Sequence, residues 1–171
     1  LQGAYDSSLS SNSDIYVAKF SLGGNGAADL LYSTYLGGGT NYESSSAIAV
    51  DSTGKIYVAG NTASTDHPTT AGAYQETHAL GGGSDAYLSI LDPALGTSGL
   101  IYSTFLGGTG YDDIEDMYVD PATGTVYAVG YITSTSASLA ATIGAYANDN
   151  AGAYDAFVAV LNPAGAGTAD L

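Results

Sequence analysis

The chain has 171 residues, 45% of them hydrophobic, so it is long and apolar enough for one domain with a buried core and is no disordered tail. Its formal net charge is -15, from 17 acidic residues against two lysines and no arginine, which argues against nucleic acid and anionic membranes as partners. The absence of cysteine excludes disulfides and cysteine-based metal sites, and no apolar run approaches the roughly 20 residues of a membrane span. The chain starts at Leu1 with no visible signal peptide, and we expect it to be a trimmed piece of something longer.

Two short strands are predicted near the start of the chain, after a loop over residues 1–13. Asp14–Phe20 alternates large side chains and points them to both faces of a strand. A Gly-rich turn at residues 23–26 follows. Leu30–Leu36 combines β-branched and aromatic residues before three glycines, which is typical of a strand that ends in a sharp turn. Residues 40–46 are expected to form a connector.

A hairpin is predicted at Ala47–Thr62, and the rest of the chain is organised around it. Two apolar runs, Ala47–Val50 and Ile56–Ala59, flank the turn Asp51–Gly54, whose glycine suits a positive φ. In the second run both sides of the strand are apolar, so this strand expects cover on both faces. The two sides are formed by Ile56 and Val58 and by Tyr57 and Ala59.

The same elements return about seventy residues later, which identifies a repeat. The hairpin returns at Met117–Gly130, the first strand at Asp85–Leu91 and Asp155–Leu161, and the Leu30–Leu36 strand at Leu100–Leu106. Residues 109–116 are the second connector. A Gly-Ala-Tyr trio recurs at residues 3–5, 72–74 and 144–146, after Ser/Thr-rich loops in the later two cases.

The fold class predicted from these elements is all-β, because no segment has the 3.6-residue apolar period and caps of a helix. Four short antiparallel strands that are apolar on both faces bury themselves only against further sheets. Radial stacking of such sheets gives a β-propeller. A linear β-solenoid is the alternative, but solenoid coils usually repeat at shorter periods.

Blades of four strands divide the chain into about 2.4 repeats. By analogy with related propellers, residues 1–36 are expected to give the outer strands of a first blade, residues 47–106 a complete blade, and residues 116–171 a third blade that lacks its last strand. Propellers need roughly four to eight blades, so the piece comes from a longer array or its copies associate. Three copies would supply about seven blades, and unpaired edges at both ends also favour a head-to-tail filament.

The order YSTYLGG, AIAVDSTGKIYVAGNT, TDHPTTAGAYQ and GGGSDAYLSILDP resembles the SBBP family of β-propeller repeats, found in large bacterial and archaeal surface or secreted proteins. The resemblance covers essentially the whole chain. It implies a propeller blade and an extracellular or cell-surface setting, and it brings no catalytic motif. Where the family tends to have an aromatic residue after Thr-Asp, this chain has His67, and the second unit loses that motif at Ser136–Tyr146.

One acidic cluster is a candidate calcium loop, because Ca²⁺ takes several oxygen ligands. It consists of Asp112, Asp113, Glu115 and Asp116. The alternative is a solvated turn. The aligned residues 41–46 of the first unit have far fewer carboxylates, and the DxDxDG pattern is absent, so a calcium site in every blade is not expected.

Other acidic residues recur at fixed places and predict structural hydrogen bonds. Asp51 and Asp120 are expected to cap their own hairpin turns by accepting backbone N–H bonds. Asp14, Asp85 and Asp155 open the same strand in each unit, where we expect a recurrent bond, with a neighbouring blade as one candidate partner.

The two histidines, His67 and His78, are candidates for a Ser-His-Asp triad or a metal pair, but the sequence supports neither. No G-x-S-x-G elbow exists, and both histidines fall in one loop of one unit. Six of the fifteen tyrosines occupy repeated strand positions, where packing between blades competes with a sugar-binding platform. These are Tyr16, Tyr32, Tyr57, Tyr87, Tyr102 and Tyr127. We therefore predict no catalytic, cofactor-binding or metal-binding residues and no cofactor, with calcium as the only candidate ion.

The function predicted from the sequence is a non-enzymatic structural or adhesive segment of an extracellular β-propeller protein. Its expected partners are copies of itself or adjacent blades of a longer chain, with surface filaments as one outcome. A carbohydrate- or peptide-binding propeller, with glycans as partners, is the alternative. A third hypothesis is a hydrolase whose active residues lie elsewhere in a longer parent chain.

Overall fold

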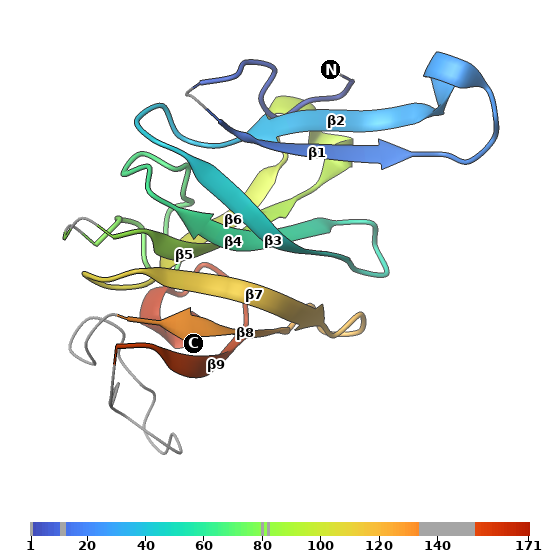
Figure 1. Cartoon of the computed structure of the whole chain (residues 1–171). Helices are drawn as coiled ribbons and strands as arrows, with labels where there is room; N and C mark the ends of the chain where they lie inside the picture. The colour runs from blue at the N-terminus through green and yellow to red at the C-terminus, as the bar shows by residue number, and fades with distance from the viewer. Residues whose placement is uncertain (1, 11–12, 80, 82, 134–152) are drawn as a thin grey trace.

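The computed structural model of the chain describes residues 2–10, 13–79, 81, 83–133 and 153–171. These residues fold into three antiparallel sheets, and the only helical elements among them are short 3-10 turns, as the predicted all-β class requires. The sheets are the N-terminal sheet β1–β2, the central sheet β3–β4–β5–β6 and the C-terminal sheet β7–β8–β9. Figure 1 shows them one above another, with the N-terminal sheet at the top. Their assignment to successive propeller blades stays a prediction.

The strand bounds follow the sequence repeat. They are β1 Ile15–Phe20, β2 Leu30–Leu36, β3 Glu43–Val50, β4 Ile56–Thr62, β5 Asp85–Leu91, β6 Leu100–Leu106, β7 Asp112–Val119, β8 Val126–Ile132 and β9 Asp155–Leu161. The connecting 3-10 turns are η1 Gly26–Asp29, η2 Pro93–Ser98 and η3 Gly167–Asp170. The hairpin glycines Gly54 and Gly124 have φ of 88° and 75°, which confirms the turn chemistry expected of them.

The prediction of two connectors was wrong, because most of the residues in both segments belong to strands. β3 begins at Glu43 and β7 at Asp112, and each contains a bulge, between Ser45 and Ala47 and between Ile114 and Asp116. The serine-rich and acidic compositions hid this extension, since neither shows an apolar alternation. A glycine opposite each bulge lets the backbones approach closely: a Cβ at Gly60 or Gly130 would collide with the facing strand.

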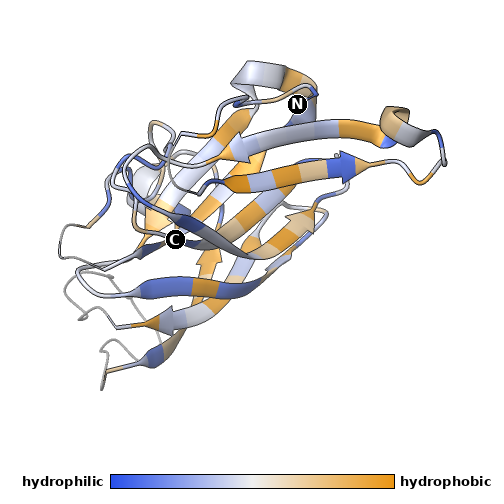
Figure 2. Cartoon of the chain, turned by 45° about the horizontal axis from the view of Figure 1, so that its top comes forward, coloured by the Kyte–Doolittle hydropathy of each residue, from blue (hydrophilic) through white to orange (hydrophobic). Residues whose placement is uncertain are grey.

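Strand β4 of the central sheet is covered on both faces, as its two-sided apolar pattern predicted. On one side Ile56 and Val58 join a cluster with Ile15 and Val17 of the N-terminal sheet. On the other side Tyr57, Ala59, Leu88 and Ile90 pack with Ile114, Val126 and Leu161 of the C-terminal sheet. Figure 2 shows orange apolar bands on strands of the stacked sheets. Burial of these two faces is the main source of stability that the sequence supplies.

The segments that carry the Gly-Ala-Tyr trio lie beside the last strand of their own sheet. Gln2 and Asp6 pair with β2 through backbone bonds to Ser33 and Tyr35. Thr70 and Gln75 pair with β6 in the same way, through Ser103 and Phe105. The third trio, at residues 144–146, lies outside the described residues.

Candidate functional site

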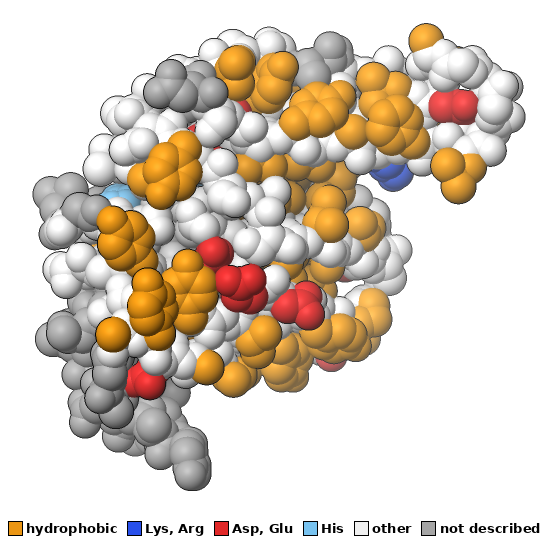
Figure 3. Space-filling model, in the orientation of Figure 1, with side chains coloured by type: hydrophobic (Ala, Val, Ile, Leu, Met, Phe, Trp, Pro, Cys, Tyr) orange, Lys and Arg blue, Asp and Glu red, His pale blue; other side chains and the backbone are white. Residues whose placement is uncertain are grey.

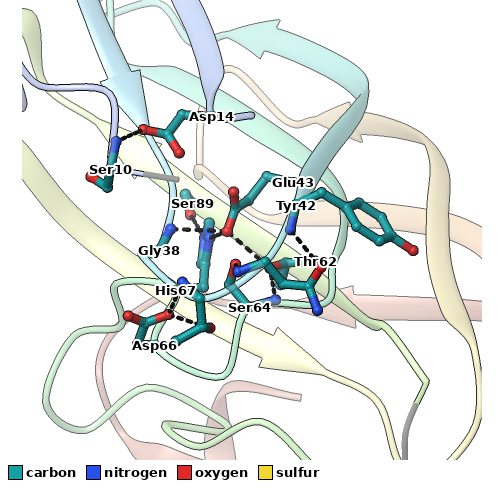
Figure 4. Close-up of polar contacts among 12 residues, drawn as sticks. Ser10, Asp14, Gly38, Tyr42, Glu43, Thr62, Ser64, Asp66, His67 and Ser89 are labelled. Carbon is teal, nitrogen blue, oxygen red and sulfur yellow. Dashed lines mark hydrogen bonds and ion pairs between the residues drawn. The ribbon is translucent and has the colours of Figure 1, made fainter. Parts of the chain in front are cut away.

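A chain of polar contacts on one face of the central sheet joins His67, Ser89 and Glu43 (Figure 4). His67 Nε2 lies 3.4 Å from Ser89 Oγ, and His67 Nδ1 lies 4.0 Å from Glu43 Oε1. Burial alone would raise the pKa of Glu43, but its neighbours His67 and Ser64 and the Gly38 backbone outweigh burial and lower that pKa. The order serine, histidine, carboxylate is that of a hydrolase triad.

Burial decides against a hydrolytic role for these three residues. All three side chains are buried, and Ser89 Oγ is 2.7 Å from Ser103 Oγ, so a substrate carbonyl has no approach to the serine. The His67 ring instead packs on Tyr87 and Phe105, with ring centroids 4.6 and 6.0 Å apart. His67 thus fills the place of an aromatic core side chain.

His78 is the second buried histidine, and it contacts a different carboxylate. Its Nε2 lies 3.9 Å from Asp85 Oδ1, and its ring meets Phe105 edge-on at 5.5 Å. Burial raises the pKa of Asp85 to about 6, although the Ala79 backbone bond and His78 lower it, and the charge of Asp112 raises it. Both histidines therefore pack on Phe105 as side chains of the core, beside separate carboxylates.

The acidic cluster expected as a calcium loop lies on β7, where it is divided into a buried pair and an exposed pair on either side of the bulge. Asp112 and Asp113 are buried, whereas Glu115 and Asp116 are exposed. Asp112 accepts bonds from the backbone of Gly108 and Thr133, and Asp113 Oδ2 accepts a bond of 2.6 Å from Asn61. Within the ranges that the structure describes, no three histidine or acidic side chains are placed to hold a metal ion. The stretch is a strand that joins neighbouring sheets.

Four of the five recurrent aspartates accept structural bonds of the kind expected of them. Asp51 Oδ1 accepts bonds from the N–H groups of Thr53 and Lys55, and Asp120 Oδ1 accepts one from Ala122. At the strand starts, Asp14 Oδ2 accepts a bond from the N–H of Ser10, and Asp85 Oδ2 accepts one from Ala79.

Each sheet junction also holds a pair of carboxylates around one glycine. A Cβ at Gly37 would lie 2.7 Å from Asp14 Oδ1 and 2.9 Å from Glu43 Oε2. A Cβ at Gly107 would lie 2.9 Å from Asp112 Oδ2 and 2.9 Å from the carboxyl carbon of Asp85. The glycines leave the space that the paired acids of adjacent sheets occupy, and sequence reasoning missed this pairing because the partners are about thirty residues apart.

Four of the six repeated tyrosines pack between sheets, as predicted, and two do not. Tyr32, Tyr57, Tyr87 and Tyr102 are buried. Tyr16 and Tyr127 are exposed, because they lie on the outward faces of the N-terminal and C-terminal sheets. Figure 3 shows orange side chains gathered over β1 and β2 at the top of the molecule.

The open face of the C-terminal sheet comprises Tyr127, Val129, Val158 and Val160, all exposed. In the repeat these residues correspond to Tyr57, Ala59, Leu88 and Ile90 of the central sheet, all buried. Leu88 is 1% exposed and its counterpart Val158 is 74% exposed. Among the described residues, the same apolar face is therefore covered in one sheet and uncovered in the next. Sequence reasoning predicted unpaired ends, but it named none of these residues as a surface.

A cleft of about 370 Å³ lies between the turns of the central and C-terminal sheets. Its lining includes Asp51, Lys55, Tyr57, Tyr102 and Asn162. Burial, followed by the charge of Asp51, raises the pKa of Tyr57 to about 12, and the Tyr57 hydroxyl donates to Asp51 Oδ2. The Tyr102 hydroxyl donates in turn to buried Asp170 at 3.1 Å. Because Tyr57 and Tyr102 are nearly buried, the cleft offers mainly the polar groups of Asp51, Lys55 and Asn162 to a ligand.

The comparisons with known proteins agree with the repeat. No helix in the described parts of the chain is long and apolar enough to cross a membrane. No curated protein matches the sequence. The model of the SBBP family, described as a beta-propeller repeat, matches residues 31–67, which run from β2 through the hairpin β3–β4 to His67. The chain thus carries a repeat of the SBBP beta-propeller family.

Proposed function

We propose that this chain is a non-enzymatic structural segment of an extracellular or cell-surface protein and that it works by associating with further repeats. Those repeats are copies of the chain or continuing blades of a longer one, and association end to end builds an adhesive surface or a filament. The SBBP match supports the repeat module, and the secreted setting typical of such repeats supports the location.

One observation carries the proposal: the open face of the C-terminal sheet is the counterpart of a buried face. Tyr127, Val129, Val158 and Val160 are apolar at the positions where the central sheet packs against its successor. An exposed apolar face of this kind marks an interaction surface. The opposite end has the matching feature, because Tyr16 and Phe20 are exposed where Tyr87 and Leu91 of the central sheet are buried.

Sedimentation velocity over a range of concentrations tests the association, with electron microscopy of the same samples. The weight-average mass is expected to rise above the 17.1 kDa of one chain as concentration increases. Val158→Asn is expected to weaken association, while Leu95→Asn, at an exposed leucine of η2, is the matched control. A single species of chain mass at every concentration would contradict association between copies of the chain and leave only continuing blades of a longer one.

Carbohydrate binding at the cleft is the second candidate, and the polar lining of the cleft, with Asp51, Lys55 and Asn162, favours it. A glycan array with the purified chain tests it. Binding that is lost in Lys55→Ala, at a polar group of the cleft, would support this function. An array without signal would rule it out for the glycans displayed.

A further inference from the structure

One end of the C-terminal sheet departs from the repeat, because tyrosines replace small polar residues there. Tyr131 of β8 and Tyr154, which precedes β9, stand where the central sheet has Asn61 and Ser84. Their rings contact each other, with centroids 5.7 Å apart and planes tilted by 57°. Tyr131 is half-buried, and Tyr154 is 70% exposed. The two tyrosines therefore present an aromatic surface that the repeat pattern does not require.

Carboxylates replace serines beside these rings. Asp113 and Glu115 of β7 stand where β3 has Ser44 and Ser46. Asp113 is directly opposite Tyr131 in the pairing of β7 with β8, which makes their side chains neighbours. Glu115 follows two residues later and is exposed. The aromatic and the acidic departures from the repeat thus fall in one place.

The groups at this place act on one another electrostatically. Burial raises the pKa of the Tyr131 hydroxyl, and the charges of Asp113 and Glu115 raise it further. Tyr154 and Tyr42 act in the same direction, so both lie near this hydroxyl. Burial and the charge of Glu115 raise the pKa of Asp113, whose Oδ1 is buried without a hydrogen-bond partner among the described residues. Negative charge is therefore concentrated beside the tyrosine rings.

The central sheet contributes a third ring. Tyr42 directly precedes β3 and is 45% exposed. Figure 4 shows its ring directed away from the buried contacts of Glu43 and His67. Figure 3 shows red and orange side chains next to one another over β7. Tyr42 forms the tyrosine–carboxylate patch together with Asp113, Glu115, Tyr131 and Tyr154.

No cation of the chain neutralises this patch. The only two lysines are Lys19 and Lys55, and among the described residues neither forms an ion pair with it. The formal net charge of -15 concentrates cations near the molecule. A partner therefore has to supply the positive charge that matches the patch.

We infer that the tyrosine–carboxylate patch binds an arginine-containing segment of another protein. A guanidinium stacks on tyrosine rings and pairs with carboxylates through its planar fork of donors, whereas an ammonium is a compact, strongly hydrated charge. A second copy of these 171 residues does not fit as the partner, because they contain no arginine. The inference goes beyond association between repeats, since its partner has a different chemistry.

A labelled tetra-arginine peptide tests the inference in a fluorescence anisotropy titration with the 171-residue chain. A labelled tetralysine peptide of the same charge is matched to it. The arginine peptide is expected to bind at least about threefold more tightly, because stacking on tyrosine favours the guanidinium. Equal affinity for the two peptides, or no binding of either, would overturn the inference.

Four variants locate the bound peptide. Tyr154→Ser installs the residue of the central sheet and should weaken binding by at least about threefold, with Tyr16→Ser, at another exposed tyrosine, as its control. Glu115→Gln should weaken binding by at least about twofold, with Glu76→Gln, at another exposed carboxylate, as its control. Both controls should bind as the wild type does. Equal weakening by patch and control variants would show diffuse attraction to an acidic chain and would contradict the inference.

Discussion

The central and C-terminal sheets have nearly the same strands and opposite surroundings. Leu88 and Val158 occupy one position of the repeat, as do Tyr57 and Tyr127, yet the first of each pair is buried and the second exposed. The difference does not come from residue type, since all four are apolar or aromatic. It comes from packing: the C-terminal sheet covers this face of the central sheet, and no described element covers the corresponding face of the C-terminal sheet. The apolar side chains of a repeat thus mark the face that a neighbouring repeat would cover.

The largest effect is expected from truncating equivalent side chains in the two sheets. Leu88→Ala should lower the free energy of unfolding by about 2–5 kcal/mol, because it leaves a cavity in a packed junction. Val158→Ala should change it by no more than about 0.5 kcal/mol in the monomer, because the side chain is exposed. Urea denaturation at low protein concentration measures both. Similar losses would mean that the C-terminal sheet is covered.

A smaller effect is expected from pH at the junction between these sheets. Because the pKa of Asp85 is about 6 in the folded chain against an ordinary 3.8, the folded state binds this proton more tightly. This stabilising contribution is fully present below about pH 4 and is lost as pH rises through 6, and it amounts to about 1–3 kcal/mol.

Urea unfolding of wild type and Asp85→Asn between pH 4.5 and about 7.5 checks that sign. The variant should gain stability relative to wild type as pH rises, since its side chain carries no charge to bury. Asp116→Asn, which removes an exposed carboxylate, controls for net charge. A wild-type-to-variant difference that is the same at every pH would contradict the assignment.

Substitution of the glycine opposite the bulge should lower the stability of the central and C-terminal sheets by a similar amount. Gly60→Ala and Gly130→Ala each place a Cβ against the backbone of the facing strand, so each should cost about 1–3 kcal/mol. Thermal or urea unfolding of the two variants measures the costs. A cost at Gly60 alone would show that the bulge of the C-terminal sheet is free to relax.

The smallest effect is expected at His67, in the loop that covers the central sheet. His67→Phe should change stability by less than about 1 kcal/mol, because the ring packs on Tyr87 and Phe105 and its polar contacts are long, 3.4 Å to Ser89 and 4.0 Å to Glu43. His67→Ala is the matched truncation and should be clearly less stable. A severe loss in the phenylalanine variant would show that the contact with Glu43 matters more than packing.

The sequence predicted the strands well because their signals are local. Alternation in Asp85–Leu91 and a glycine after Leu100–Leu106 are each visible within about eight residues. The starts of β3 and β7 were missed, since a bulge and a serine-rich or acidic run interrupt that alternation. The turn-capping role of Asp51 was predictable for the same reason, because its partners are two and four residues away.

The candidate site was less predictable because its members come from distant segments. Asp85 meets Asp112, and His67 meets Ser89, only after the sheets have stacked and the loop has folded over β6. The bare face of Tyr127 and Val158 has the composition of a buried one, so composition could not reveal its exposure. Counting repeats predicted that the ends were unpaired, and the structure shows which side chains they present.

Amide hydrogen exchange in β8 of a chain extended after Leu171 by residues 31–106 tests the central claim most directly, since the extension supplies the outer strand and the next sheet. Exchange of the backbone around Tyr127 and Val129 should slow until it matches that of Tyr57 and Ala59 in β4, and it should slow less in a chain extended by residues 31–38 alone. Exchange in β8 that is unchanged by the added repeat would contradict the account.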